Sequence, residues 1–210
     1  MITLRLTRKL LDRVGSPTAA TEPSTTLLGD WYGQLVFVGH QRYVLLVSER
    51  SRLPVIMPGR DLKNLARNFP GALAEVLQAL GVPRAAMRRE VEASSEGVIA
   101  VTNSRSHLGT LNEFSQALRY RLWEEPDAEL VEIALWLAET PVGPLGGESP
   151  DRLTPRLLGY DAHVSPGRRR RRTRAENDRF MGVRRVFGGC SAGVKSQYPL
   201  YTLAPVPSLQ

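Results

Sequence analysis

Residues 31–57, WYGQLVFVGHQRYVLLVSERSRLPVIM, decide the fold of this chain, because three runs of β-branched and aromatic residues follow one another there. Residues 31–38 and 43–48 are two such runs, and the GHQR between them is typical of a hairpin turn. The polar turn ERSR leads to a third run at residues 53–57. Because runs joined by short polar turns pair in succession, this stretch predicts an antiparallel meander of three strands.

The segments around the meander predict further strands and a set of helices. Ile2, Leu4 and Leu6 alternate with polar residues, which is the period of a half-buried strand, and residues 98–102 form another apolar run. Elsewhere, apolar residues recur every three or four positions, which indicates amphipathic helices. The predicted helices cover residues 10–14, 61–80, 83–93, 108–122, 126–140 and, as a short last element, 150–158. The pattern predicts an α+β fold, a small antiparallel sheet of four or five strands with about four helices mainly on one face.

The distribution of charge divides the chain near residue 160. The net charge of +7 comes from 28 Lys and Arg against 21 Asp and Glu. Residues 1–160 hold 18 basic and 18 acidic side chains, whereas residues 161–210 hold 10 and 3. We therefore predict one globular domain over residues 1–160 and a basic tail of low order, rich in Arg, Gly and Pro, over residues 161–210.

The tail contains a run of arginines that has two interpretations. A basic arm binds nucleic acid by releasing counterions from phosphates, so this run is a candidate nucleic-acid interface. Its residues are Arg168, Arg169, Arg170, Arg171, Arg172 and Arg174. The chain also uses 25 Arg but only 3 Lys, a bias expected of a GC-rich gene, and shifted reading frames of such DNA encode Arg-, Gly- and Pro-rich peptides. On that second interpretation the tail has no role.

Few residues suit metal or redox chemistry. Cys190 is the one cysteine, which excludes an intramolecular disulfide and fits a reducing compartment, so we predict the cytoplasm. His40, His107 and His163 are not spaced as metal ligands are. The longest apolar run, residues 133–138, is far shorter than the ~20 residues of a membrane span. We predict no metal, no cofactor and no membrane partner.

The most suggestive segment is TNSRSHLGTLNEF, residues 102–114, a polar junction between a strand and a helix. A helix N-terminus offers unpaired N–H groups and a partial positive charge, so donors beside it suit an anion. The candidate ligand-binding residues are Asn103, Ser104, Arg105, Ser106 and Asn112. The competing interpretation is structural: Ser106 caps the helix and Asn103 completes a turn, since the stretch lacks the lysine and glycine spacing of a phosphate loop.

Three further charges, Asp30, Glu49 and Arg50, fall at predicted strand ends. Together with the junction they would form a ligand surface, and our first hypothesis is a non-enzymatic binding or regulatory module for an anionic ligand. The alternative is an enzyme for an anionic or phosphorylated substrate, with Asp30 or Glu49 as acid/base and Arg105 as the anion clamp. Solvated surface charges also explain these residues, so the sequence leaves the function unknown.

Four motifs together resemble a known family. They are TTLLGDWY at 25–32, VSER with LPV at 47–55, TNSRS with GTLNEF at 102–114, and LWLAETP at 135–141. As a set they are similar to an uncharacterised bacterial family known only as a domain of unknown function, over about residues 2–158. The resemblance implies no activity, cofactor or catalytic residue, and it ends where the basic tail begins.

Overall fold

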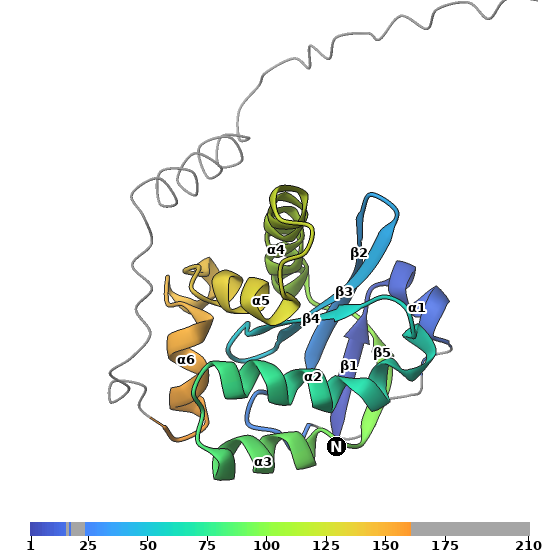
Figure 1. Cartoon of the computed structure of the whole chain (residues 1–210). Helices are drawn as coiled ribbons and strands as arrows, with labels where there is room; N and C mark the ends of the chain where they lie inside the picture. The colour runs from blue at the N-terminus through green and yellow to red at the C-terminus, as the bar shows by residue number, and fades with distance from the viewer. Residues whose placement is uncertain (16, 18–23, 161–210) are drawn as a thin grey trace, which may run out of the picture. The chain divides into compact units, whose positions relative to one another are not determined.

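The computed structural model describes residues 1–15, 17 and 24–160, and it contains a five-stranded sheet in the order β4-β3-β2-β1-β5 (Figure 1). The strands are β1 (Ile2–Leu6), β2 (Trp31–Val38), β3 (Gln41–Ser48), β4 (Pro54–Pro58) and β5 (Gly97–Val101). The α-helices are α1 (Arg8–Val14), α2 (Leu65–Ala79), α3 (Arg84–Ala93), α4 (Arg105–Glu124), α5 (Leu130–Ala138) and α6 (Pro150–Leu157). Two 3-10 helices cover Leu62–Asn64 and Gly143–Leu145. The α+β class is confirmed.

The sheet is mixed, which corrects the predicted antiparallel arrangement. β2, β3 and β4 form the expected meander, in which Trp31 pairs with Ser48. β1 instead runs parallel to both of its neighbours, with Leu4 beside Trp31 of β2 and beside Ile99 of β5. Parallel neighbours need a crossover connection, and helices supply it: α1 precedes β2, while α2 and α3 precede β5.

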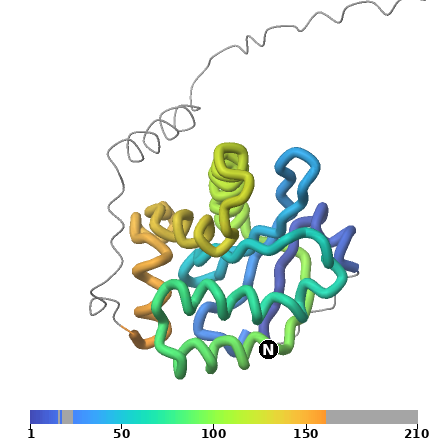
Figure 2. The backbone as a smooth tube through the Cα atoms, in the orientation of Figure 1, coloured from blue at the N-terminus to red at the C-terminus, as the bar shows by residue number. Residues whose placement is uncertain are grey.

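Helices cover both faces of the sheet, whereas the sequence predicted mainly one face. Successive residues of a strand point to opposite faces. Trp31 packs edge-on against Phe69 of α2, with ring centroids 4.9 Å apart. Gln34, three positions further along β2, donates to the backbone oxygen of Leu111 on α4 over 2.7 Å. α2 therefore lies on one face, in front of the strands and beside α3 in Figures 1 and 2, and α4 lies on the other.

Several helix bounds differ from the sequence expectation, and two of these differences have a clear local cause. The helix predicted from residue 126 begins at Leu130, because the N–H of Ala128 donates to the backbone oxygen of Glu125 (3.1 Å) and closes a turn first. The helix predicted over residues 61–80 divides into the 3-10 turn Leu62–Asn64 and α2. Each of the six predicted helical segments overlaps one α-helix of the structure.

Candidate functional site

Tyr32 and His107 join β2 to the start of α4. Tyr32 follows Trp31, so its ring lies on the face of the sheet that α4 covers. The ring stacks on the imidazole of His107, with centroids 3.7 Å apart and 12° between the planes. His107 is the third residue of α4 and is buried. The stack therefore fixes the first turn of α4 over β2.

Hydrogen bonds of His107 tie the same turn to the chain that follows β3. Its Nδ1 lies 2.7 Å from Oγ of Ser104, the N-cap residue of α4, and its Nε2 lies 3.2 Å from the backbone oxygen of Glu49. A carbonyl oxygen only accepts hydrogen bonds. In the neutral imidazole the proton is therefore on Nε2, and Nδ1 accepts a hydrogen bond from the Ser104 hydroxyl.

Buried hydroxyl groups shape the turn between β3 and β4. The Oγ atoms of Ser48 and Ser51 are 2.7 Å apart, and Thr154 of α6 donates to Ser51 Oγ over 2.8 Å. Ser48 Oγ also accepts from the N–H groups of Ser51 and Leu53. Breaking one of these buried bonds leaves another group without a partner, which is costly. The network holds Arg52 in a left-handed conformation, with φ of 58°.

Arg52 is the one non-glycine residue with positive φ in the described part of the chain. It is only 6 % exposed, and it forms no ion pair with the described residues. Its Nη2 donates to Ser106 Oγ over 3.2 Å, whereas Nε and Nη1 are buried without a hydrogen-bond partner there. Burial lowers the pKa of Arg52 below its ordinary value, and the neighbouring Tyr32 and Glu49 oppose this incompletely. The site thus holds a buried cation that forms no ion pair with the described residues and that the charge of Glu49 compensates only in part.

The Arg52 guanidinium lies against the positive end of a helix. α4 has 20 residues, and its aligned peptide dipoles leave a partial positive charge at its first turn. Ser104 accepts the N–H groups of His107 and Leu108, while those of Arg105 and Ser106 have no partner among the described residues. A guanidinium and a helix N-terminus repel each other, and both are complementary to an oxyanion.

The two carboxylates proposed from the sequence have structural partners. Asp30 forms a 2.7 Å ion pair with Arg5 of β1, although its Oδ1 is buried without a partner in the described residues. Glu49 accepts from the N–H of Asp30 over 3.0 Å and covers Gly29, where a Cβ would lie 2.5 Å from Glu49 Oε2. Gly29 also has φ of 77°, which favours glycine. Both carboxylates therefore hold the chain that enters β2.

Tyr32 provides a neutral hydroxyl at the centre of this group. Burial raises the pKa of Tyr32 above its ordinary value; Arg5 opposes the rise, and the carboxylates of Glu49 and Asp30 reinforce it. The phenol therefore keeps its proton at physiological pH, and it donates to Asn103 Oδ1 over 3.5 Å. The site consequently combines hydroxyl donors, one guanidinium without an ion pair, and backbone N–H groups without a partner among the described residues.

The structure brings together some of the residues predicted from the sequence and not others. Those joined through Tyr32, His107 and Arg52 are Asp30, Glu49, Asn103, Ser104 and Ser106. Arg50 instead donates to the backbone oxygen of Leu27 over 3.3 Å. The side chains of Arg105 and Asn112 are exposed and make no hydrogen bond or ion pair with the residues that the structure describes. Arg52 therefore replaces Arg105 as the cation of the site.

Sequence reasoning missed Tyr32, Arg52 and His107. For Tyr32 the available signal was its alternation with Trp31, which sends the two rings to opposite faces. For His107 the available signal was its position three residues after Ser104, because an N-cap side chain contacts the residue at that position in the first helical turn. For Arg52 no signal exists, because its turn is polar and nothing local marks a buried cation.

Residues 3–153 match the model of a family described as a domain of unknown function (DUF6933). The chain belongs to this family. The match confirms the resemblance that the four sequence motifs indicated, and the family description names no activity. No curated protein and no solved structure matches the chain.

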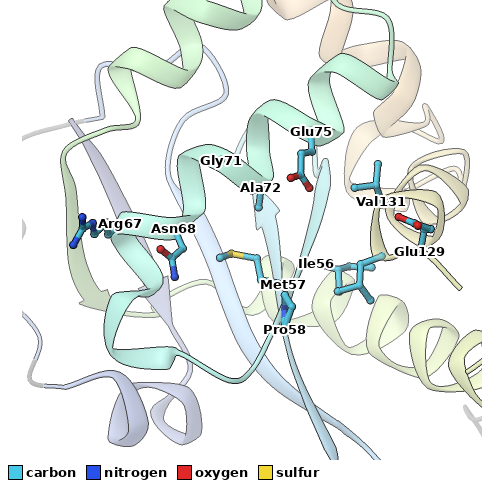
Figure 3. A pocket seen from close by; sticks show the side chains of 11 residues that line it. Ile56, Met57, Pro58, Arg67, Asn68, Gly71, Ala72, Glu75, Glu129 and Val131 are labelled. Atoms are coloured by element: carbon cyan, nitrogen blue, oxygen red, sulfur yellow. The ribbon is translucent and has the colours of Figure 1, made fainter. Parts of the chain in front are cut away.

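A separate pocket in this DUF6933 chain lies between β4, α2 and α5 (Figure 3). Its volume is about 630 Å³, and Ile56, Met57, Ala72 and Val131 contribute to an apolar lining. The polar side chains around it, such as Glu75, are exposed, and no buried polar atom without a partner lies among its residues. At the start of α4, by contrast, Nε and Nη1 of Arg52 are buried without a partner in the described residues, so we consider that site the stronger candidate for ligand binding.

Several sequence predictions lie outside the described residues. These are the arginine run with Arg174, together with His163, Cys190 and the proposed boundary of the tail, so the nucleic-acid interface stays a prediction. Within residues 1–15, 17 and 24–160, no three His, Cys, Asp or Glu side chains gather in a way that could hold a metal ion. In the same residues no helix combines the length and the apolar character needed to cross a bilayer.

Glu90 anchors the segment that leads into the site. Its carboxylate accepts the N–H groups of Leu27 and Leu28, each over 2.9 Å, and the residue is 2 % exposed. Burial raises the pKa of Glu90 above its ordinary value near 4.5, while the two N–H groups and the charge of Arg50 oppose the rise. The folded protein therefore holds this proton at pH values where the unfolded chain has lost it.

This raised pKa predicts a pH-dependent contribution of Glu90 to stability. Between the ordinary and the raised pKa the folded state binds more protons, so the free energy of unfolding falls as the pH rises through that interval. Glu90→Gln removes the titration. Urea titrations of the wild type and of Glu90→Gln give the free energy of unfolding of each at several pH values. We expect the difference, wild type minus variant, to fall from pH 4 towards neutrality. A difference that stays flat or grows with pH would contradict the role given to burial.

Proposed function

We propose that this chain binds a small molecule that carries an oxyanion, such as a phosphate, sulfate or carboxylate group. The observation that supports the proposal is the Arg52 guanidinium, buried against the first turn of α4 with Nε and Nη1 unpaired in the described residues. The oxyanion would bind between Arg52 and the N–H groups of Arg105 and Ser106.

Burial of the Arg52 guanidinium is energetically costly. A buried charge without a partner costs several kcal/mol, in the order of magnitude known for broken buried ion pairs. Arg5 does not incur this cost because Asp30 forms an ion pair with it, whereas Arg52 forms no ion pair with the described residues and the charge of Glu49 offsets its burial only in part. An oxyanion would supply the missing charge and accept hydrogen bonds that are about twice as strong as neutral ones.

Access to the site comes from the surface at the start of α4. Asn103 and Ser106 are exposed and Ser104 is half-buried, so the first turn is open to a ligand. Nε and Nη1 of Arg52 are buried beneath it, so a ligand contacts them after the side chains at this turn move aside. Ser106 Oγ accepts a hydrogen bond from Nη2 of Arg52 over 3.2 Å, and an oxyanion, which is a stronger acceptor, would replace the hydroxyl. The one cysteine of the chain supports a reducing compartment, and the cytoplasm is where we place this function.

Thermal unfolding in the presence of inorganic phosphate tests the proposal. The full chain is melted at neutral pH in increasing phosphate, with the ionic strength kept constant by chloride. We expect the unfolding midpoint of the wild type to rise, by the equivalent of about 2.7 kcal/mol when phosphate is 100-fold above its Kd. Arg52→Gln removes the charged donor, so its midpoint should not respond.

Arg84→Gln is the matched control. Arg84 is exposed at the first position of α3, so this variant loses the same charge beside another helix N-terminus. Its midpoint should rise as that of the wild type does. The basic tail is identical in all three proteins and cannot account for a difference. A rise of equal size in Arg52→Gln, or no rise in the wild type, would overturn the proposed function.

A further inference from the structure

The Ser104 hydroxyl is held more closely by an imidazole than by the helix that it caps. Its Oγ lies 2.7 Å from His107 Nδ1 but 3.5 Å from the N–H of His107, which is the hydrogen bond of an ordinary N-cap. Since Nε2 carries the proton and donates to the backbone oxygen of Glu49, Nδ1 is a free base directed at the hydroxyl. A serine hydroxyl hydrogen-bonded to an oriented imidazole is the arrangement that activates a nucleophile.

The surroundings keep this pair in position. His107 is 7 % exposed and its ring is stacked on Tyr32, so the imidazole cannot turn away from Ser104 without losing the stack and the bond to Glu49. Ser104 itself is half-buried and open to a substrate. The N–H of Arg105, the residue after Ser104, has no partner among the described residues, and it would donate to the carbonyl oxygen of a substrate whose anionic group is held by Arg52 and the N–H of Ser106.

We propose that Ser104 is a nucleophile and His107 its general base, acting on a carboxylic ester whose acyl group carries a second, anionic group. This inference rests on the proposed function, because the anionic group binds at Arg52 and places the ester carbonyl at Ser104. It adds a covalent reaction to a site that otherwise only binds. The substrate class is therefore an ester of a dicarboxylic acid or of another acid with an anionic substituent.

The reaction proceeds in two steps that need only water as a co-reactant. Ser104 Oγ forms a bond to the ester carbonyl carbon while its proton moves to His107 Nδ1. The carbon–oxygen bond to the alcohol then breaks, and the alcohol leaves with that proton. A water molecule next attacks the acyl-serine, again with its proton passing to Nδ1. The acyl–Oγ bond breaks, Oγ recovers the proton, and the carboxylic acid is released.

The backbone oxygen of Glu49 stabilises His107 in its protonated form during the reaction. While Nδ1 holds the transferred proton, the imidazole is a cation, and the bond from Nε2–H to the Glu49 oxygen stabilises that cation. The groups facing the ring are the phenol of Tyr32, which stacks on it, and the Ser104 hydroxyl. Glu49 therefore acts through a backbone atom and is a positioning residue.

Two nitrophenyl esters test the proposal with the full chain. The probes are the mono-para-nitrophenyl ester of succinic acid, which is anionic, and para-nitrophenyl acetate, which is neutral. We expect release of para-nitrophenol from the anionic ester, and mass spectrometry should locate a succinyl group on Ser104. Ser104→Gly should lower the rate at least about 100-fold, the lower range for losing an acid–base-assisted step. Glycine is a tolerated N-cap residue, so this variant keeps its fold.

The remaining variants separate chemistry from structure. His107→Gln should lower the rate of ester hydrolysis as much as Ser104→Gly does. Ser95 is an exposed serine just after α3, and Ser95→Ala should hydrolyse the ester at the wild-type rate. Arg52→Gln should remove the preference for the anionic over the neutral ester. Equal rates in the wild type and Ser104→Gly, or succinyl groups on other residues only, would overturn the inference. Phosphate binding through Arg52 would then still stand, since the melting experiment measures it separately.

Discussion

Replacing Arg52 with glycine is expected to raise the free energy of unfolding of the anion-free protein by about 1–3 kcal/mol. Two costs disappear together in this variant. Glycine adopts the φ of 58° at residue 52 without the steric cost that a side chain adds, and the unpaired buried guanidinium is gone. The lost packing of the long side chain offsets part of the gain. Urea unfolding in chloride buffer at neutral pH measures the change.

Arg52→Gln separates the two contributions. It removes the charge but keeps a side chain at a positive φ, so it should be less stable than Arg52→Gly by about 1 kcal/mol. Both variants should lose the response to phosphate. If Arg52→Gly unfolds more easily than the wild type, Arg52 is a structural support of the turn and not a group kept for a ligand.

Replacing Trp31 with alanine is expected to cost about 3–5 kcal/mol of the free energy of unfolding. Trp31 is fully buried on the face of the sheet opposite the site, where it packs edge-on against Phe69 of α2. The substitution leaves a large cavity between β2 and α2. Since the native free energy is typically ~5–15 kcal/mol, the variant should lose a large share of its stability and unfold at a clearly lower urea concentration, as urea titration followed by circular dichroism would show.

Trp31→Phe is the informative companion of this variant. The indole Nε1 of Trp31 is buried without a hydrogen-bond partner in the described residues, so removing it gives up no hydrogen bond. We expect Trp31→Phe to cost clearly less than Trp31→Ala, because an aromatic ring still packs against Phe69. Similar costs for the two variants would mean that the indole is not packed as the structure shows.

The local elements of the fold could be predicted from the sequence because their signals are local. The meander from Trp31 to Pro58 and the long helix α4 follow directly from period-two and period-3.6 patterns. The direction of β1 could not be predicted. Alternation in Ile2, Leu4 and Leu6 shows a strand with a buried face, but it is the same for parallel and antiparallel partners. The two-sided covering by α2 and α4 depends likewise on contacts between distant segments.

The candidate site was predicted in part for the same reason. The junction at Ser104 and Ser106 is visible because N-cap residues have a characteristic composition. The partner of this junction, Arg52, is 54 residues away from Ser106 in the chain and is placed by the hydroxyl network around Ser51. Arg105 looked like the anion clamp because it is adjacent in sequence, but a helix directs its side chain to solvent. Tertiary contacts, not composition, decide which arginine faces the site.

The most direct test of the central claim is the response of Arg52 itself to an anion. In proton–nitrogen correlation spectra of the full chain, the Nε–H signal of Arg52 is assigned by its loss in Arg52→Gln, and phosphate is added at constant ionic strength. We predict that this signal and the amide signals of Arg105 and Ser106 shift along one saturating curve, while the Nε–H signal of Arg84 does not. An Arg52 signal that stays unchanged while the wild-type protein is saturated with phosphate would contradict the anion site.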